Sequence, residues 1–155
     1  MDIKRLEHAT ERHKTSYLSC GSVDAQPIIM LHGWPDLSIG WEEQLKFFGA
    51  QGYHAIAPDM RGYGSSSIPE NHSDYCMREI VKDMIELLSS LGHKQAIWVG
   101  HDWGSPVVWN IALHHPEAVK GLVSLCVSFG WGGHPNSYLS LSLIHISEPT
   151  RPSRI

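Results

Sequence analysis

The sequence predicts an α/β fold with a mostly parallel sheet. From residue 27 onward, short apolar runs alternate with longer segments in which apolar residues recur at helical spacing, which is typical of successive βαβ units. At residues 101–104 one apolar run passes into a helical segment with no spacer. The 155 residues, 42% of them hydrophobic, suffice for one core, and no internal repeat or linker divides them.

The expected elements follow one another in a regular order. A weakly alternating segment at 12–18 is expected to form a hairpin strand at the sheet edge. Buried strands are expected at 27–31, 54–57, 95–100 and 119–127. Helices are expected at 41–52, 73–91 and 105–115. Gly52 closes the first helix and Pro116 ends the third.

Residues 100–104, which read GHDWG, form the sharpest chemical motif. A turn this tight between a buried strand and a helix requires small flanking residues and holds its central side chain in a strained pose above the sheet. That central residue is Asp102. A carboxylate is already ionised near neutral pH and attacks an sp³ carbon without an activating base, which predicts a nucleophile. The alternative role for Asp102 is a helix N-cap.

A second motif, HGWPD at 32–36, follows an earlier strand of the same predicted sheet. The carboxyl ends of strands in an open α/β sheet line one crevice, so this loop and Asp102 are expected to meet there. The backbone N–H groups of Trp34 and Trp103 are then placed to point at one oxygen, which predicts an oxyanion hole.

Three segments carry a resemblance to a known family. HGWPD, PDMRGYGSSSIP and VGHDWGSPVVW, in this order, resemble the α/β-hydrolase superfamily and most of all its soluble epoxide hydrolase branch, over Leu6 to Val127. The resemblance implies an α/β-hydrolase core and a parent enzyme that converts an epoxide and water to a vicinal diol through an ester on Asp102. It also implies that the Trp34 and Trp103 amides form the oxyanion hole and that His32 shapes their loop.

Two alternatives remain open. A haloalkane dehalogenase forms the same ester with departure of halide, although dehalogenases tend to carry Asn at the position of Trp34. The Trp103 indole is expected to line the substrate pocket in either enzyme and does not separate them. A non-catalytic member of the fold that binds a small ligand is the other alternative.

The resemblance further implies a His that activates water, an acid that orients this His, and Tyr residues from a helical cap. The candidates for these roles after Asp102 are two acidic residues, one Tyr and four His residues, and none of them fits: Glu117, Glu148, Tyr138, His114, His115, His134 and His145. We therefore expect a chain truncated before the cap and the last strands, and a fragment without turnover of its own.

The C-terminal residues are expected to be foreign to the fold. Leu141 to Arg151 reads LSLIHISEPTR, which resembles the translation of a sequencing-library adaptor, whereas the alternative is a period-2 strand. This interpretation divides the chain into residues 1–138, the N-terminal part of an α/β-hydrolase domain, and residues 139–155, a non-native tail.

Composition and motifs argue against several classes of binding partner and cofactor. A net charge of −4 without a basic stripe argues against nucleic acid binding, and no apolar run suggests a membrane segment. Three scattered cysteines and eleven histidines without ligand spacing favour a reduced, cytoplasmic protein with no metal and no cofactor. The glycines and serines at 62–67 favour a turn over a phosphate loop.

Asp59 and Arg61 are expected either to form an ion pair with each other or to be solvated. The sequence does not predict the oligomeric state.

Overall fold

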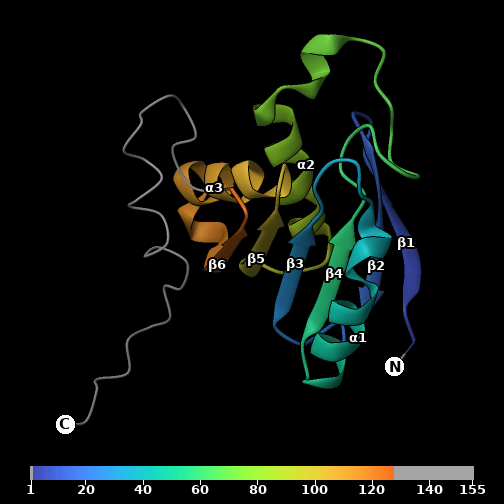
Figure 1. Ribbon diagram of the computed structural model, residues 1–155, viewed down its shortest axis with the longest axis vertical. Helices are drawn as coiled ribbons and strands as arrows, with labels where there is room; N and C mark the ends of the chain where they lie inside the picture. The colour runs from blue at the N-terminus through green and yellow to red at the C-terminus, as the bar shows by residue number, and fades with distance from the viewer. Residues whose placement is uncertain (1, 128–155) are drawn as a thin grey trace, which may run out of the picture.

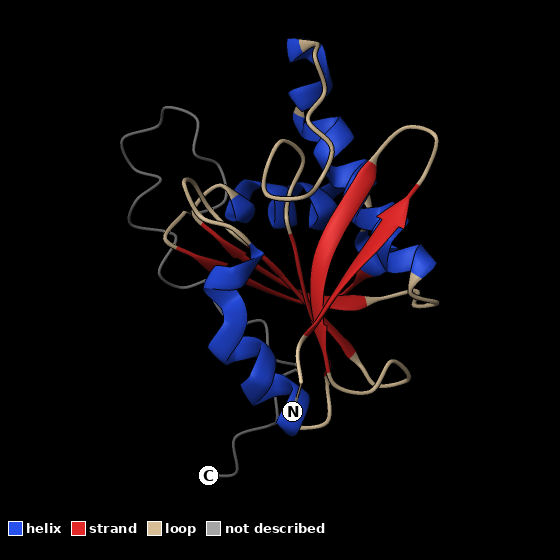
Figure 2. Cartoon of the chain, turned by 90° about the vertical axis from the view of Figure 1, so that its right-hand side faces the viewer, coloured by secondary structure: helices blue, strands red, loops and turns tan. Residues whose placement is uncertain are grey.

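A computed structural model describes residues 2–127 as one twisted six-stranded sheet with helices on both faces (Figures 1 and 2). The strands are β1 (Lys4–Ala9), β2 (Lys14–Cys20), β3 (Pro27–Leu31), β4 (His54–Pro58), β5 (Ala96–His101) and β6 (Val119–Leu125). The α-helices are α1 (Glu42–Ala50), α2 (Met77–Ser90) and α3 (Gly104–His114). Residues 2–127 also contain three 3₁₀ turns: η1 (Ser38–Trp41), η2 (His72–Tyr75) and η3 (Pro116–Ala118).

The strand order, β1-β2-β4-β3-β5-β6, determines where a site can form. β4, β3, β5 and β6 run parallel, whereas β1 and β2 pair antiparallel at one side. The chain leaves β3 toward β4 in one direction and later continues through β5 in the other. β3 and β5 are direct neighbours, so their carboxyl ends border the crevice at this topological switch point.

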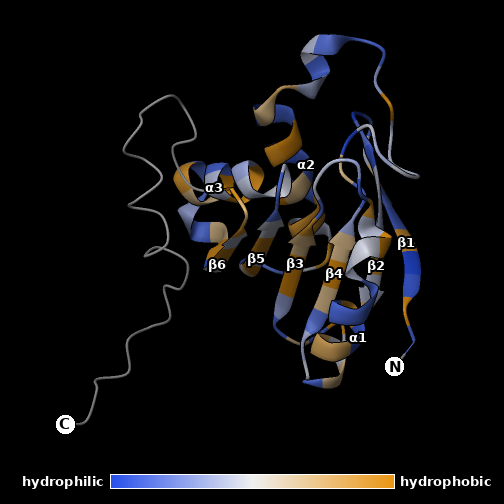
Figure 3. Ribbon diagram, in the orientation of Figure 1, coloured by the Kyte–Doolittle hydropathy of each residue, from blue (hydrophilic) through white to orange (hydrophobic). Residues whose placement is uncertain are grey.

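Each face of the sheet has its own apolar core because successive strand side chains point to opposite faces. In β3, Ile29 and Leu31 pack with α2 and α3, whereas Ile28 and Met30 pack toward α1. Figure 3 shows apolar residues concentrated in the central strands, whereas β1 is largely hydrophilic.

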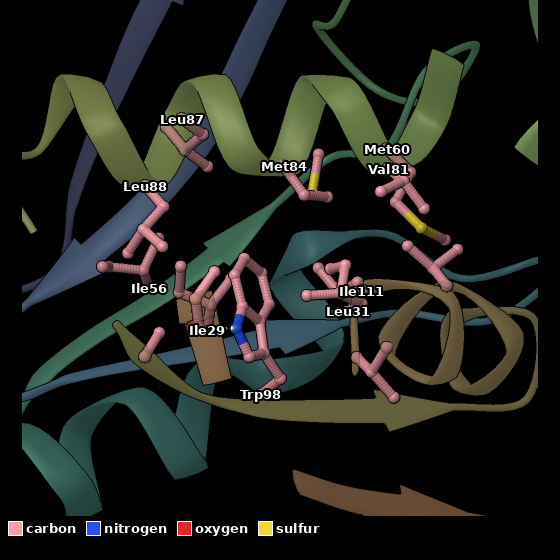
Figure 4. Packing of buried hydrophobic residues seen from close by; sticks show 14 of the residues in the cluster. Ile29, Leu31, Ile56, Met60, Val81, Met84, Leu87, Leu88, Trp98 and Ile111 are labelled. Carbon is pink, nitrogen blue, oxygen red and sulfur yellow. Dashed lines mark hydrogen bonds between the residues drawn. The ribbon is translucent and has the colours of Figure 1, made fainter. Parts of the chain in front are cut away.

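The larger core lies under α2 and α3 (Figure 4). Met84 and Leu87, three residues apart on α2, are fully buried in it with Trp98 from β5. The Trp98 indole N–H donates to the Ala118 carbonyl at 3.0 Å, so this buried polar atom is satisfied. The burial of Trp98 agrees with the buried strand expected at 95–100, while Trp109 on α3 is only partly buried and donates to Ser124 at 3.1 Å.

The α/β fold with a mostly parallel sheet is confirmed, and two details of the prediction are wrong. Two N-terminal strands form instead of one, and β1, not β2, is the edge strand. β1 is exposed at nearly every position and therefore lacks apolar alternation. The expected helix at 73–91 begins as a 3₁₀ turn, and Cys76, in extended backbone with ψ 152°, separates that turn from α2.

Several predictions fall outside the described residues. These are the domain boundary at 138, the tail 139–155, and the roles weighed for His134, Tyr138, His145 and Glu148. Within residues 2–127, no helix has the length and apolar character needed to cross a bilayer.

Candidate active site

Asp102 occupies a tight turn between β5 and α3. Its φ of +50° lies in the left-handed region, a strained conformation for a residue other than glycine. The flanking glycines have no room for a side chain: a Cβ on Gly100 would lie 2.4 Å from the Gly104 carbonyl oxygen, and one on Gly104 would lie 2.4 Å from that of Leu31. The expected need for small residues on both sides of Asp102 is confirmed.

The Asp102 carboxylate faces the loop that follows β3. Its Oδ1 accepts the backbone N–H of Trp34 at 2.9 Å. The N–H groups of Trp34 and then of Trp103 hold the pKa of Asp102 below its usual value. No side-chain hydrogen bond caps α3, whose N-cap residue is Trp103, so the carboxylate does not act as a helix cap.

Gly33 brings the two loops together. A Cβ on Gly33 would lie 2.4 Å from the Asp102 Cβ and 2.8 Å from its Oδ1, so only glycine allows this approach. Gly33 is a site residue that was not predicted from the sequence. The signal that would have found it is a glycine within a motif that is expected to face a tight turn.

His32 stabilises the start of the loop from inside the protein. The ring is 1% exposed, and its Nε2 accepts the Met60 N–H at 3.0 Å, so Nδ1 carries the proton and donates to the Gly33 carbonyl at 2.9 Å. Burial lowers the pKa of His32 and keeps the ring neutral. Its contacts are therefore those of a residue that shapes the loop.

The expected ion pair between Asp59 and Arg61 is wrong, and neither residue is solvated. Arg61 instead makes two 2.8 Å hydrogen bonds to Asp83 on α2. Asp59 accepts from Arg5 on β1 at 2.9 Å. Arg5 lies 54 residues from Asp59 in the sequence, and Asp83 lies 22 residues from Arg61. Both pairs therefore result from tertiary packing, which the spacing of neighbouring residues does not reveal.

Two exposed tryptophans belong to the turn and to the loop that faces it. Trp34 and Trp103 are 66% and 54% exposed. A recess of about 160 Å³ is lined by Asp102, Trp103, Pro106 and Val127. A second hollow of about 370 Å³ also uses the Trp103 indole, and its wall is mostly apolar: Met60, Arg61, Tyr63, Tyr75, Met77, Ile80 and Val107.

Pairs of histidine and carboxylate lie elsewhere in the described part of the chain. His13 lies 3.6 Å from Asp83, and His115 lies 3.4 Å from Glu117 beyond the far end of α3, about 16 Å of helix from Asp102. His114 and Glu117 are exposed. Residues 2–127 also contain no group of three or more metal-ligating side chains.

Comparison with known proteins identifies the family. The family described as the alpha/beta hydrolase fold matches residues 26–141. This chain belongs to that family. The alpha/beta hydrolase is 40% identical over 128 residues to epoxide hydrolase 2 of Siraitia grosvenorii and 41% identical over 110 residues to epoxide hydrolase A of Mycobacterium tuberculosis (strain ATCC 25618 / H37Rv). These matches cover 82% and 71% of the chain, but only 40% and 34% of the two relatives.

Solved structures agree with this assignment. The alpha/beta hydrolase superposes on an epoxide hydrolase from Vigna radiata with a TM-score of 0.79 and 36% identity, over 82% of this chain and 41% of the other. Epoxide hydrolase A from Mycobacterium thermoresistibile gives a TM-score of 0.79 and 34% identity, over 82% and 40%. The chain thus spans about two fifths of the length of these relatives.

Proposed function

We propose that this chain carries the nucleophile and the oxyanion donors of an epoxide hydrolase, which converts an epoxide and water to a vicinal diol through an ester on Asp102. One observation carries the proposal: Asp102 sits at a strained turn after β5 and accepts the Trp34 N–H from the neighbouring β3 loop at 2.9 Å. The pKa of Asp102, lowered by the Trp34 and Trp103 amides, keeps the attacking group ionised.

The reaction divides into two steps. In the first, a carboxylate oxygen of Asp102 bonds to an oxirane carbon, the ring C–O bond breaks, and the released oxygen takes up a proton from solvent. In the second, water adds to the ester carbonyl, and the N–H groups of Trp34 and Trp103 hold the oxyanion until it collapses to the diol and the free carboxylate, with one proton returned to solvent. Neither step requires a cofactor.

Trp34, whose backbone N–H reaches Asp102, and Trp103, which follows it in the chain, are both exposed aromatic residues that supply apolar surface. An epoxide with apolar substituents gains most from covering such surface. Trp103 lines the recess that contains Asp102, which supports its assignment to substrate binding.

The two steps have different requirements, and the described residues supply mainly the first. No pair of histidine and carboxylate in residues 2–127 lies at Asp102, since those present pair His13 with Asp83 and His115 with Glu117. General-base activation of water is worth about 10²- to 10⁴-fold in rate. We therefore expect the ester to form on this chain and to hydrolyse slowly.

The test is intact-mass spectrometry after incubation with styrene oxide. The wild-type chain should gain the full mass of one epoxide, located on Asp102 by peptide mapping, and Asp102→Asn should gain none. Incubation with a bromoalkane distinguishes the dehalogenase, which would add only the alkyl group and release bromide. Absence of any adduct on Asp102 would refute the proposal and favour a non-catalytic member of the family.

A further inference from the structure

The loop that carries the Trp34 N–H, residues 32–38, is held at both ends by two consecutive residues. At its start, the Met60 N–H donates to His32 Nε2 at 3.0 Å. At its end, the Ser38 N–H donates to Asp59 Oδ1 at 2.9 Å. Because Asp59 and Met60 directly follow β4, the neighbour of β3, both anchors belong to one short segment at the carboxyl edge of the sheet.

The Asp59 carboxylate is itself immobilised. The Asp59 side chain is 2% exposed, and its Oδ2 accepts from Arg5 Nη1 at 2.9 Å and from the Ser65 N–H at 3.2 Å. Burial alone would raise the pKa of Asp59, but hydrogen bonds from Ser38, Ser65 and Arg5 outweigh burial and lower it. Gly64 packs so closely that a Cβ there would lie 2.3 Å from Oδ2.

We propose that Asp59 is a positioning residue that sets the place of the Trp34 N–H relative to Asp102 by holding the far end of the 32–38 loop at Ser38. A seven-residue loop held at both ends has little freedom, and loss of the hydrogen bond from the Ser38 N–H removes its anchor on the Asp59 carboxylate. This inference rests on the proposed function only for the chemical role of the Trp34 N–H. The position of that N–H relative to Asp102 does not depend on the proposed function.

The test compares Asp59→Asn with Asp83→Asn. Asparagine keeps the size of the side chain but presents an NH₂ group to the donors that met the carboxylate. Asp83 is the matched control, since it is also a buried carboxylate paired with arginine and makes no hydrogen bond to residues 32–38. Selective ¹⁵N-tryptophan labelling, with Trp34→Phe for assignment, reports on the Trp34 amide. In the wild type we expect this amide signal to follow the titration of Asp102.

With Asp59→Asn, the Trp34 amide should shift upfield and lose its response to the titration of Asp102, whereas Asp83→Asn should change neither. The maximal rate of adduct formation with styrene oxide should fall about ten- to hundredfold, as a displacement near 1 Å predicts, with little change in the half-saturating concentration. A loss of stability alone would not move the amide signal of the folded protein.

The inference is overturned if Asp59→Asn leaves the Trp34 amide unchanged, or if Asp83→Asn shifts it equally. Should Asp59→Asn fail to fold, Ser38→Pro removes the same hydrogen bond from the other partner at the first position of η1, where proline is tolerated. If the wild type forms no adduct but the amide responds as expected, the proposed function fails and the positioning role of Asp59 stands.

Discussion

Replacing Gly33 with alanine tests the close approach of the two loops. The added Cβ would lie 2.4 Å from the Asp102 Cβ, whereas ordinary contact begins at 3.4 Å, so the loops must separate by about 1 Å. The hydrogen bond from Trp34 to Asp102, now 2.9 Å, would then lengthen to about 3.9 Å, beyond hydrogen-bonding range. Overpacking of this kind lowers the free energy of unfolding by about 1–3 kcal/mol.

Two assays follow the consequences of Gly33→Ala. Urea unfolding, monitored by tryptophan fluorescence, measures the loss of stability, and intact-mass spectrometry measures adduct formation, which should slow about a hundredfold for a displacement near 1 Å. Gly121→Ala is the matched control, because its Cβ would meet only Ile97 atoms at 3.7 and 3.8 Å. If Gly33→Ala has the stability and adduct rate of Gly121→Ala, the contact between the loops is not as tight as this reasoning requires.

Two further predictions concern the core and pH. Trp98→Phe removes the donor to the buried Ala118 carbonyl and should lower the free energy of unfolding by about 2–3 kcal/mol in urea titrations, whereas wild-type stability would contradict this. Burial lowers the pKa values of His13, His32 and His54, so the folded state binds fewer protons than the unfolded state and stability should fall as the pH drops below 6.5. Three such groups lower the free energy of unfolding by at most about 4 kcal/mol per pH unit, which urea titrations at several pH values measure. A free energy of unfolding that rises on acidification would refute the predicted sign.

Much of the fold was predictable because buried parallel strands consist of continuous runs of apolar residues. The run at 27–31 coincides with β3, and the run at 54–57 lies within β4. β1 was missed because its exposed edge position requires no apolar alternation. The sequence carries no marker for a strand that is stabilised mainly by its ladder with β2.

The meeting of Trp34 with Asp102 was predictable for a topological reason. Both residues follow parallel strands, and the carboxyl ends of such strands share one edge of the sheet. The supports behind them were not predictable, because Asp59 pairs with Arg5 and Arg61 pairs with Asp83 through contacts between distant segments. Local spacing favoured the two nearest opposite charges, and tertiary packing chose different partners.

The arrangement of the site separates the two halves of the proposed reaction along the chain. The groups that hold and orient the nucleophile come from the loops after β3, β4 and β5, and all of them lie within residues 2–127. Their hydrogen bonds connect them to one another and to the sheet, so we expect the proposed ester formation to depend on the part of the fold that the structure describes. Water activation requires a base opposite the ester, and the histidines of this part that contact carboxylates do so away from Asp102. The rate at which an ester accumulates on Asp102 therefore measures the contribution of residues 2–127 to the first step, separately from water activation.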